Sequence, residues 1–243
     1  MNYEEKVLNL GKSMRIISLE KDSLNVQSRY GPSKIVKLPL KINPDLSCFI
    51  AVVIGDGHLS KEKFRTTIES SNKELLEVLS SIINKLFSMN TNIKEIKKRE
   101  RKKQTYHLSA YSKAVQELLS LVFNIPRGKK SDFVKIPEEI HKAKDSIKAA
   151  FVIGLLAAEG SRRGEHSVRI CSASQDLLIG TKKLLLDLKI PSKTESWINK
   201  KYKKQYYSLS FKRTYLRSLT RGCRSGQTGL ILSIFNRVIR GHA

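Results

Sequence analysis

The sequence predicts an α+β fold of two similar halves, each a mostly antiparallel sheet with helices on one face. Two apolar runs, at 46–60 and 149–161, each end in a small residue, an acidic residue and a glycine. Matching segments recur about 100 residues apart, a period that is too long for a solenoid repeat and suits a duplicated small domain. Alternating and helical patterns follow one another in each half. We therefore expect a pseudo-twofold pair that packs through its two apolar helices into a saddle.

The repeat begins at residue 36 and is visible in short matched segments. The pairs are Val36-Lys37-Leu38-Pro39 with Val134-Lys135-Ile136-Pro137, and Tyr106-His107-Leu108-Ser109-Ala110 with Tyr207-Ser208-Leu209-Ser210-Phe211. The spacing drifts slightly between pairs, which indicates short loop insertions within one fold. The chain therefore divides into an N-terminal extension (1–35), a first half (36–130), a second half (131–221) and a C-terminal packing helix (222–243).

The first half is expected to have an αββαββα-like order. Residues 63–70 alternate, with Phe64, Thr66 and Ile68 on one face and charged or polar side chains on the other. Asn72 is suited to cap the amphipathic helix that follows. The expected elements are a helix within 46–60, a strand over 63–70, a helix over 74–87, strands over 93–98 and 105–111, and a closing helix over 115–122.

The second half is expected to repeat this order after a linker over 124–132. Its expected elements are a helix within 149–161, a strand over 167–171, a helix over 177–188, strands over 193–199 and 206–211, and a closing helix over 215–219. In the two terminal regions we expect a helix over 3–10, a strand over 14–19 and a packing helix over 230–238. Strands that are apolar on one side only leave the other face of each sheet open.

The charge balance indicates a polyanionic partner. The chain has 243 residues, with 46 Lys and Arg against 22 Asp and Glu, for a formal net charge of +24. A compact protein with this excess attracts nucleic acid or an anionic membrane surface. The longest apolar runs are about a dozen residues, too short to span a bilayer, so we expect no membrane partner.

The cysteines and the N-terminus bear on the cellular compartment. Cys48, Cys171 and Cys223 show no CxxC spacing, which argues against a disulfide framework or a zinc knuckle. The first ten residues, MNYEEKVLNL, open with acids and lack the form of a signal peptide. A reducing compartment, the cytoplasm or an organellar matrix, is expected, and secretion is not.

The two apolar helices carry paired small residues. Ala51 and Gly55 lie four residues apart, as do Gly154 and Ala158, so each pair falls on one stripe of its helix. Such pairs let two helix backbones approach closely. The packed helices would then bring Asp56 and Glu159 together at their ends. Two carboxylates this close repel each other unless they share divalent cations, so the sequence predicts a metal site built from both halves.

The two motifs resemble those of the LAGLIDADG homing endonucleases, in the monomeric form with two motifs. The nine motif positions are Phe49–Gly57 (FIAVVIGDG) and Val152–Gly160 (VIGLLAAEG). The acid is the eighth position, and Glu in the second copy is a variant that the family tolerates. One copy would be weak evidence, since an apolar helix that ends in glycine is common. Two copies inside a longer repeat are far more specific.

The resemblance implies a site-specific double-strand DNA endonuclease, intron-encoded or free-standing, that acts as a monomer on a long target. Asp56 and Glu159 would hold Mg²⁺ (or Mn²⁺), which stabilises the attacking and leaving oxygens of phosphodiester hydrolysis. No small-molecule cofactor is expected. Family members usually carry Gln or Lys near the end of the first strand of each half, where this chain has serine or alanine (Ser70, Ser71, Ser172 and Ala173). Arg162, three residues after Glu159, is the expected catalytic basic residue; Lys73, Lys129 and Lys130 are less well placed.

The open faces of the two sheets would form a basic trough for double-stranded DNA. Lys and Arg can neutralise phosphates or bind guanine, and Thr, Ser and His can reach other bases. The expected contacts on the strands are Lys63, Arg65, Thr67, Lys94, Thr105, His107, Arg169, Lys193, Trp197, Ser208 and Ser210. At the basic hairpin tips they are Lys97, Arg99 and Lys200.

Two alternatives use the same scaffold. An RNA intron maturase would need the basic surface and intron RNA, but not the carboxylates. A cleavage-deficient DNA-binding protein is motivated by the serines and alanine at the strand ends. Affinity falls with salt in all three cases, so salt dependence does not separate them.

Overall fold

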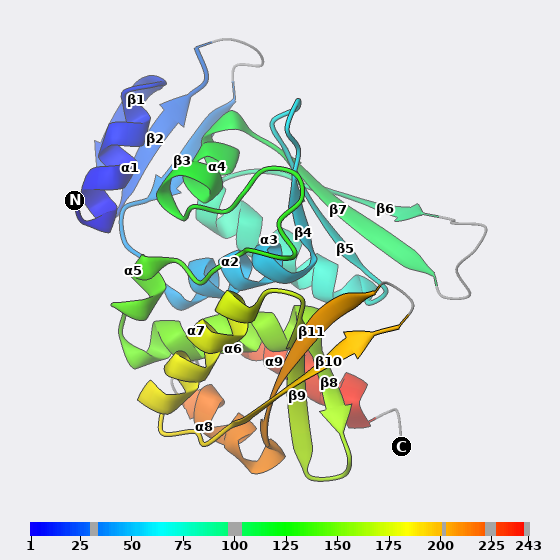
Figure 1. Cartoon of the computed structure of the whole chain (residues 1–243). Helices are drawn as coiled ribbons and strands as arrows, with labels where there is room; N and C mark the ends of the chain where they lie inside the picture. The colour runs from blue at the N-terminus through cyan, green and yellow to red at the C-terminus, as the bar shows by residue number, and fades with distance from the viewer. Residues whose placement is uncertain (30–33, 97–103, 201–202, 222–226, 241–243) are drawn as a thin grey trace.

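Two helices at the centre of the molecule organise the fold. The computed structural model describes residues 1–29, 34–96, 104–200, 203–221 and 227–240. Helix α2 (Pro44–Asp56) and helix α6 (Asp145–Glu159) pack along their lengths and cross the middle of the molecule one above the other (Figure 1). The middle of each helix, Leu46–Ile54 in α2 and Ala149–Leu156 in α6, is buried throughout.

Small residues allow this close approach, as the sequence predicts. A Cβ atom on Gly154 would lie 2.4 Å from the carbonyl oxygen of Cys48 and 2.7 Å from the Cβ of Ala51. A Cβ atom on Gly55 would lie 2.6 Å from the Cβ of Ala158. Since real side chains do not tolerate such distances, any larger residue at these glycines would force the helices apart.

The first half has the predicted αββαββα order. After α2 come β4 (Gly57–Leu59), β5 (Arg65–Ser70), α3 (Lys73–Phe87), β6 (Asn92–Ile96), β7 (Thr105–Tyr111), α4 (Lys113–Glu117) and a π-helical turn (Leu118–Val122). The strands form an antiparallel sheet in the order β4-β5-β7-β6. Asn72 caps α3 as expected, because its side chain accepts a hydrogen bond from the amide of Leu75.

The second half repeats this architecture. After α6 come β8 (Gly160–Arg163), β9 (Ser167–Ser172), α7 (Gln175–Asp187), β10 (Lys193–Asn199), β11 (Lys204–Lys212), a 3-10 turn (Arg213–Tyr215) and α8 (Leu216–Arg221). The sheet order β10-β11-β9-β8 matches that of the first half. The short strands β4 and β8 have no counterpart among the predicted ranges, because three or four residues are too few to show alternation.

The N-terminal region is a small unit of its own. It comprises α1 (Tyr3–Gly11), β1 (Arg15–Glu20), β2 (Ser23–Gln27) and β3 (Ile35–Pro39), with the sheet order β1-β2-β3. Only the helix and the first strand were expected, and the boundary placed between residues 35 and 36 falls inside β3. The Tyr3 ring packs against that of Phe123, with centroids 5.5 Å apart, and Lys6 forms an ion pair with Glu139 in α5 (Glu138–His141). This unit is thus packed onto the first half and onto the segment that leads to α6.

The C-terminal helix α9 (Gln227–Arg240) includes the predicted packing segment and lies against α6 and α3. Asp45, buried in the first turn of α2, anchors it. Oδ1 of Asp45 accepts hydrogen bonds from the amide and the hydroxyl of Thr228 at 3.3 and 3.0 Å, and Lys85 binds Oδ2 at 2.9 Å.

The lengths of the helices and the state of the cysteines bear on the expectations about membrane spans and disulfides. Within the described ranges, every helix is too short or too polar to span a lipid bilayer. Among the described residues, neither Cys48 nor Cys171 forms a disulfide, while Cys223 lies outside them.

Candidate metal and nucleic-acid site

The two motif carboxylates lie together where α2 and α6 end. A Cβ atom on Gly55 would be 3.1 Å from Cγ and 3.7 Å from Oε1 of Glu159, so the Glu159 side chain lies over the end of α2. Burial and the charge of Glu159 raise the pKa of Asp56 to about 8, against the opposing charge of Lys130, and Glu69 adds to the increase. Burial also raises the pKa of Glu159. Ionising both acids is therefore unfavourable in this setting, and a bound cation would offset that cost.

Lys130 supplies a positive charge beside this pair. Its ammonium donates to the carbonyl oxygens of Ile54 and Gly55 at 2.5 and 3.1 Å, and the residue is only 7% exposed. Burial lowers the pKa of Lys130, while Glu159 and Asp56 act to raise it. Among Lys73, Lys129 and Lys130, the lysines that the sequence marks as less well placed, Lys130 is the one beside the carboxylates. Lys73 is exposed and pairs with Glu77 at 3.4 Å.

The catalytic role predicted for Arg162 is not supported by its position. Arg162 is opposite Val168, a buried core residue, in the register of β8 and β9. Its side chain therefore lies on the helix-covered face of the sheet, and its Nε donates to the carbonyl of Gly164 at 2.8 Å. The alternation of β8 places Ser161 and Arg163, not Arg162, on the open face.

The serines at the strand ends have a structural role in both halves. The hydroxyl of Ser70 accepts from the amide of Asn72 at 3.1 Å, and that of Ser172 accepts from the amide of Ser174 at 3.1 Å. Asn72 and Ser174 then cap α3 and α7. These hydroxyls hold the turn between strand and helix.

A cavity of about 820 Å³ opens beside the carboxylates. It is bounded by the ends of both motif helices, by Glu69 and Ser70 at the end of β5, and by Phe235 of α9. Among the described residues, no group of three or more His, Cys, Asp or Glu side chains is arranged to hold a metal ion. Mg²⁺ commonly uses one or two carboxylates together with water and substrate phosphates. The pair Asp56 and Glu159 fits such a shared site for Mg²⁺ or Mn²⁺.

The open face of the first sheet carries several of the predicted DNA contacts. Arg65, Thr67 and His107 lie on it together with Glu69, and the exposed Lys94 is opposite His107. Lys63 is exposed in the turn before β5. A hollow of about 290 Å³ on this face reaches Asp56. Lys97 and Arg99 lie outside the described residues.

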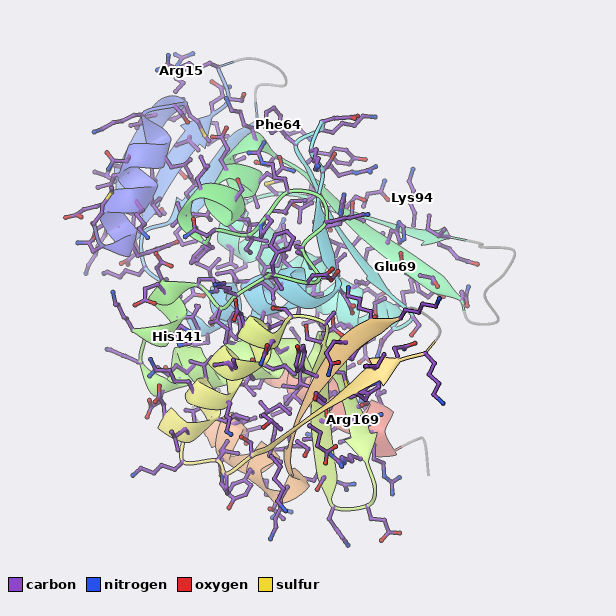
Figure 2. All side chains as sticks on the ribbon, viewed as in Figure 1. Arg15, Phe64, Glu69, Lys94, His141 and Arg169 are labelled. Atoms are coloured by element: carbon purple, nitrogen blue, oxygen red, sulfur yellow. The ribbon has the colours of Figure 1, made fainter. Side chains whose placement is uncertain are left out.

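The open face of the second sheet carries different side chains from that of the first. Arg169 donates from Nε to the hydroxyl of Ser161 at 3.1 Å, and Lys193 and Lys200 are exposed. Trp197 is 38% exposed and stacks on Tyr206, with ring centroids 6.0 Å apart. Figure 2 shows Lys94, Glu69 and Arg169 following one another from the first sheet to the second.

Three predicted DNA contacts are buried. Thr105, Ser208 and Ser210 are 5%, 2% and 8% exposed. Ser210 lies under Arg163, whose Nη1 donates to its hydroxyl at 3.3 Å and whose Nη2 binds Glu195. Alternation places these side chains on the open face, as expected, but their neighbours cover them, so a direct base contact is not available to them here. Arg163 was missed, although the alternation of residues 160–163 could have indicated it.

The sequence contains two copies of a known domain. The family model for the LAGLIDADG-like domain matches residues 44–122 and 146–224, which together make up more than half of the chain. The two matches coincide with the two halves of the structure.

Curated relatives contain a similar segment within longer proteins. The chain is 30% identical over 186 residues to the probable translation initiation factor IF-2 of Methanocaldococcus jannaschii, covering 74% of this chain and 15% of that protein. It is 29% identical over 167 residues to the replication factor C small subunit of the same organism, covering 69% of this chain and 9% of that protein. The chain therefore spans only a small part of the relatives that it matches.

Solved structures share the fold at low sequence identity. Mesophilic variants of the homing endonuclease I-DmoI match with a TM-score of 0.52 and 17% identity, over 72% of this chain and 89% of that chain. The homing endonuclease I-WcaI bound to its DNA recognition sequence matches with a TM-score of 0.51 and 14% identity, over 74% and 80%. Full-length DUF199/WhiA from Thermatoga maritima matches with a TM-score of 0.51 and 14% identity, over 82% and 61%.

Proposed function

Because the chain belongs to the LAGLIDADG family, we propose that it is a divalent-metal-dependent endonuclease that cuts both strands of a specific DNA target. One observation carries the proposal: Asp56 and Glu159 meet at the ends of two packed helices, between two open sheet faces. A fold alone does not assign chemistry, and the same fold is found in DUF199/WhiA. The argument therefore depends on the carboxylates.

Each group of residues in the site has its own proposed role. Asp56 and Glu159 would hold the metal ions, which, when bound, stabilise the attacking and leaving oxygens of the displacement. Lys130 fixes the last carbonyls of α2 and offsets part of the negative charge. Arg65, Lys94, Arg169 and Lys193 would contact the DNA from the open faces. The net charge of +24 would draw the polyanion to this surface.

The comparisons supply further support. I-DmoI has been solved in complex with DNA and Mn, and I-WcaI with its recognition sequence. The curated relatives differ in their named functions, yet each contains a segment similar to this chain. The recurrence of the segment in proteins with different named functions supports an activity of its own, separate from theirs.

The test is cleavage of DNA by purified protein. Wild type is incubated with Mg²⁺ and either DNA selected by binding from a randomised pool or the DNA that flanks its own gene. Asp56→Asn should bind the selected DNA as wild type does and lose at least about 10³-fold in cleavage rate, since it removes a metal ligand. Asp22→Asn makes the same change of charge at an exposed site in the N-terminal unit and should cut normally. Undiminished cutting by Asp56→Asn would refute the mechanism.

One observation favours a second function, sequence-specific DNA binding without cleavage. Ser70 and Ser172 are committed to the turns before α3 and α7, so the strand ends offer no Gln or Lys to order a water molecule. Tight, sequence-specific binding by wild type with no cleavage in Mg²⁺ or Mn²⁺ would establish that alternative.

A further inference from the structure

The open face of the first sheet carries a hydrogen-bonded carboxylate and imidazole beside Asp56. Nε2 of His107 and Oε2 of Glu69 are 2.9 Å apart, and the two residues are directly opposite each other on β7 and β5. Both line the same hollow as Asp56, of about 290 Å³. Glu69 also lines the larger cavity beside the carboxylates, so it lies between the sheet face and the metal site. Figure 2 shows Glu69 near the junction of the two halves.

The second sheet has different residues at the equivalent positions. By the repeat, Glu69 corresponds to Cys171 and His107 to Ser208, and these two residues are likewise opposite each other on β9 and β11. Burial raises the pKa of the Cys171 thiol; the charge of Arg169 opposes this increase, and that of Glu159 adds to it. Cys171 thus neighbours Glu159 as Glu69 neighbours Asp56. The two halves share a backbone arrangement but differ in the side chains beside their acids.

We propose that Glu69 and His107 together accept a proton from the water that attacks the scissile phosphate next to the first sheet, and that this DNA strand is cut before the other. The inference rests on the proposed function and adds that the two DNA strands are cut at different rates. In the tautomer that donates Nε2–H to Glu69, Nδ1 of His107 carries the lone pair. The Glu69 carboxylate orients the ring and stabilises the imidazolium, as a buried carboxylate does for histidine in hydrolases.

The step balances as a hydrolysis. A water molecule loses a proton to Nδ1 of His107 while its oxygen forms a bond to phosphorus. The bond from phosphorus to the leaving sugar oxygen breaks, and that oxygen takes a proton from solvent, which gives a phosphate monoester and an alcohol. A positioned base contributes roughly 10²–10⁴-fold in rate. Cys171 and Ser208 cannot replace this base at neutral pH, because a thiol with a raised pKa and a hydroxyl both keep their protons.

The test follows the two strands of one duplex separately. A DNA duplex selected on wild type is labelled with a different dye on each strand and cut under single-turnover conditions with Mg²⁺. Wild type should cut one strand at least about tenfold faster than the other. Glu69→Gln and His107→Gln should each slow that strand by about tenfold or more and leave the slower strand within about twofold, so the ratio of the rates falls towards one. Binding measured without metal should stay within about threefold of wild type; a larger loss with His107→Gln would assign His107 to the DNA contact predicted from the sequence instead and overturn the inference.

The repeat provides matched variants. Cys171→Ser, at the equivalent position of the second half, should change neither rate. The double variant Glu69→Cys with His107→Ser copies side chains that the second sheet already accommodates, and it should cut both strands at the slower rate. Equal strand rates in wild type, or a strand bias that persists in these variants, would overturn this inference alone. If wild type cuts neither strand, the proposed function fails and this inference fails with it.

Discussion

At the scale of single residues, the site is dominated by unbalanced charge. Asp56 and Glu159 repel each other in a buried setting, and Lys130 compensates only part of the charge. The motif acids could be predicted from the sequence, because each is fixed to the end of an apolar helix. Lys130 could not be placed, since its position depends on the path of a linker with no periodic pattern. The burial of Thr105, Ser208 and Ser210 also escaped prediction, because alternation gives the face of a side chain but not what covers it.

The raised pKa of Asp56 makes stability depend on pH. The folded protein holds this proton up to a pKa of about 8, against an ordinary value of 3.8, so the free energy of unfolding falls as pH rises between these values. Asp56→Asn removes this cost. In metal-free buffer at pH 8.5 it should be more stable than wild type by on the order of 2 kcal/mol, or about 4–8 °C in Tm. At pH 4 the difference should be small.

Thermal melts at several pH values check this expectation, and added Mg²⁺ provides the control. The ion should raise the Tm of wild type but not that of Asp56→Asn, because only the folded wild type binds it tightly. A wild-type Tm that rose steadily from pH 5 to pH 8.5 without metal would contradict the prediction.

Lys130 provides a second residue-scale prediction. Lys130→Met removes the ammonium that binds the carbonyls of Ile54 and Gly55 and leaves two buried acids uncompensated. At pH 8 the loss of unfolding free energy should be about 2–4 kcal/mol, and it should be smaller at pH 5, where Asp56, with its pKa of about 8, is protonated. The exposed neighbour provides the control: Lys129→Met should change stability by less than about 0.5 kcal/mol. Denaturant titrations of both variants at the two pH values measure the difference, and equal losses would contradict the prediction.

At the scale of elements, close packing of α2 on α6 sets the position of the acids. Periodic elements such as α3, β7 and β9 could be predicted from the sequence, because burial on one face imposes a period on their residues. Short elements could not, since β4 and β8 have three and four residues. The strands β2 and β3 were also missed. The turn between β1 and β2 is Lys21-Asp22, without the glycine that marks most tight hairpins.

The helix contact is testable through its glycines. Gly154→Ala would place a methyl group 2.4 Å from the carbonyl oxygen of Cys48, so the helices must separate. We expect a loss of about 2–4 kcal/mol in unfolding free energy and slower DNA cleavage, because the acids separate with the helices. Gly180→Ala, in α7, meets side-chain atoms and no backbone, Ile136 at 3.1 Å and His141 at 3.4 Å, and should stay within about 1 kcal/mol of wild type. Equal effects of the two substitutions on urea unfolding would show that the helix contact is not tight.

At the scale of the whole molecule, duplication explains both the symmetry and its breaking. The two sheets share strand order and the serine-capped turns at their ends, but the pair Glu69 and His107 is confined to the first. The aromatic stack of Trp197 on Tyr206 belongs to the second. A twofold scaffold can therefore read and process an asymmetric partner, because each half varies its open face while the central helices stay fixed.

Lys130 belongs to the connection between the halves, and this affects how the protein can be divided into two chains. Two separate copies of either half could bring their acids together as a dimer. If the chain were divided before Lys130, a dimer of first halves would lack its ammonium group. Joining the halves thus contributes a chemical group as well as a tether. Split or circularly permuted versions should keep residues 123–137 attached to the first half.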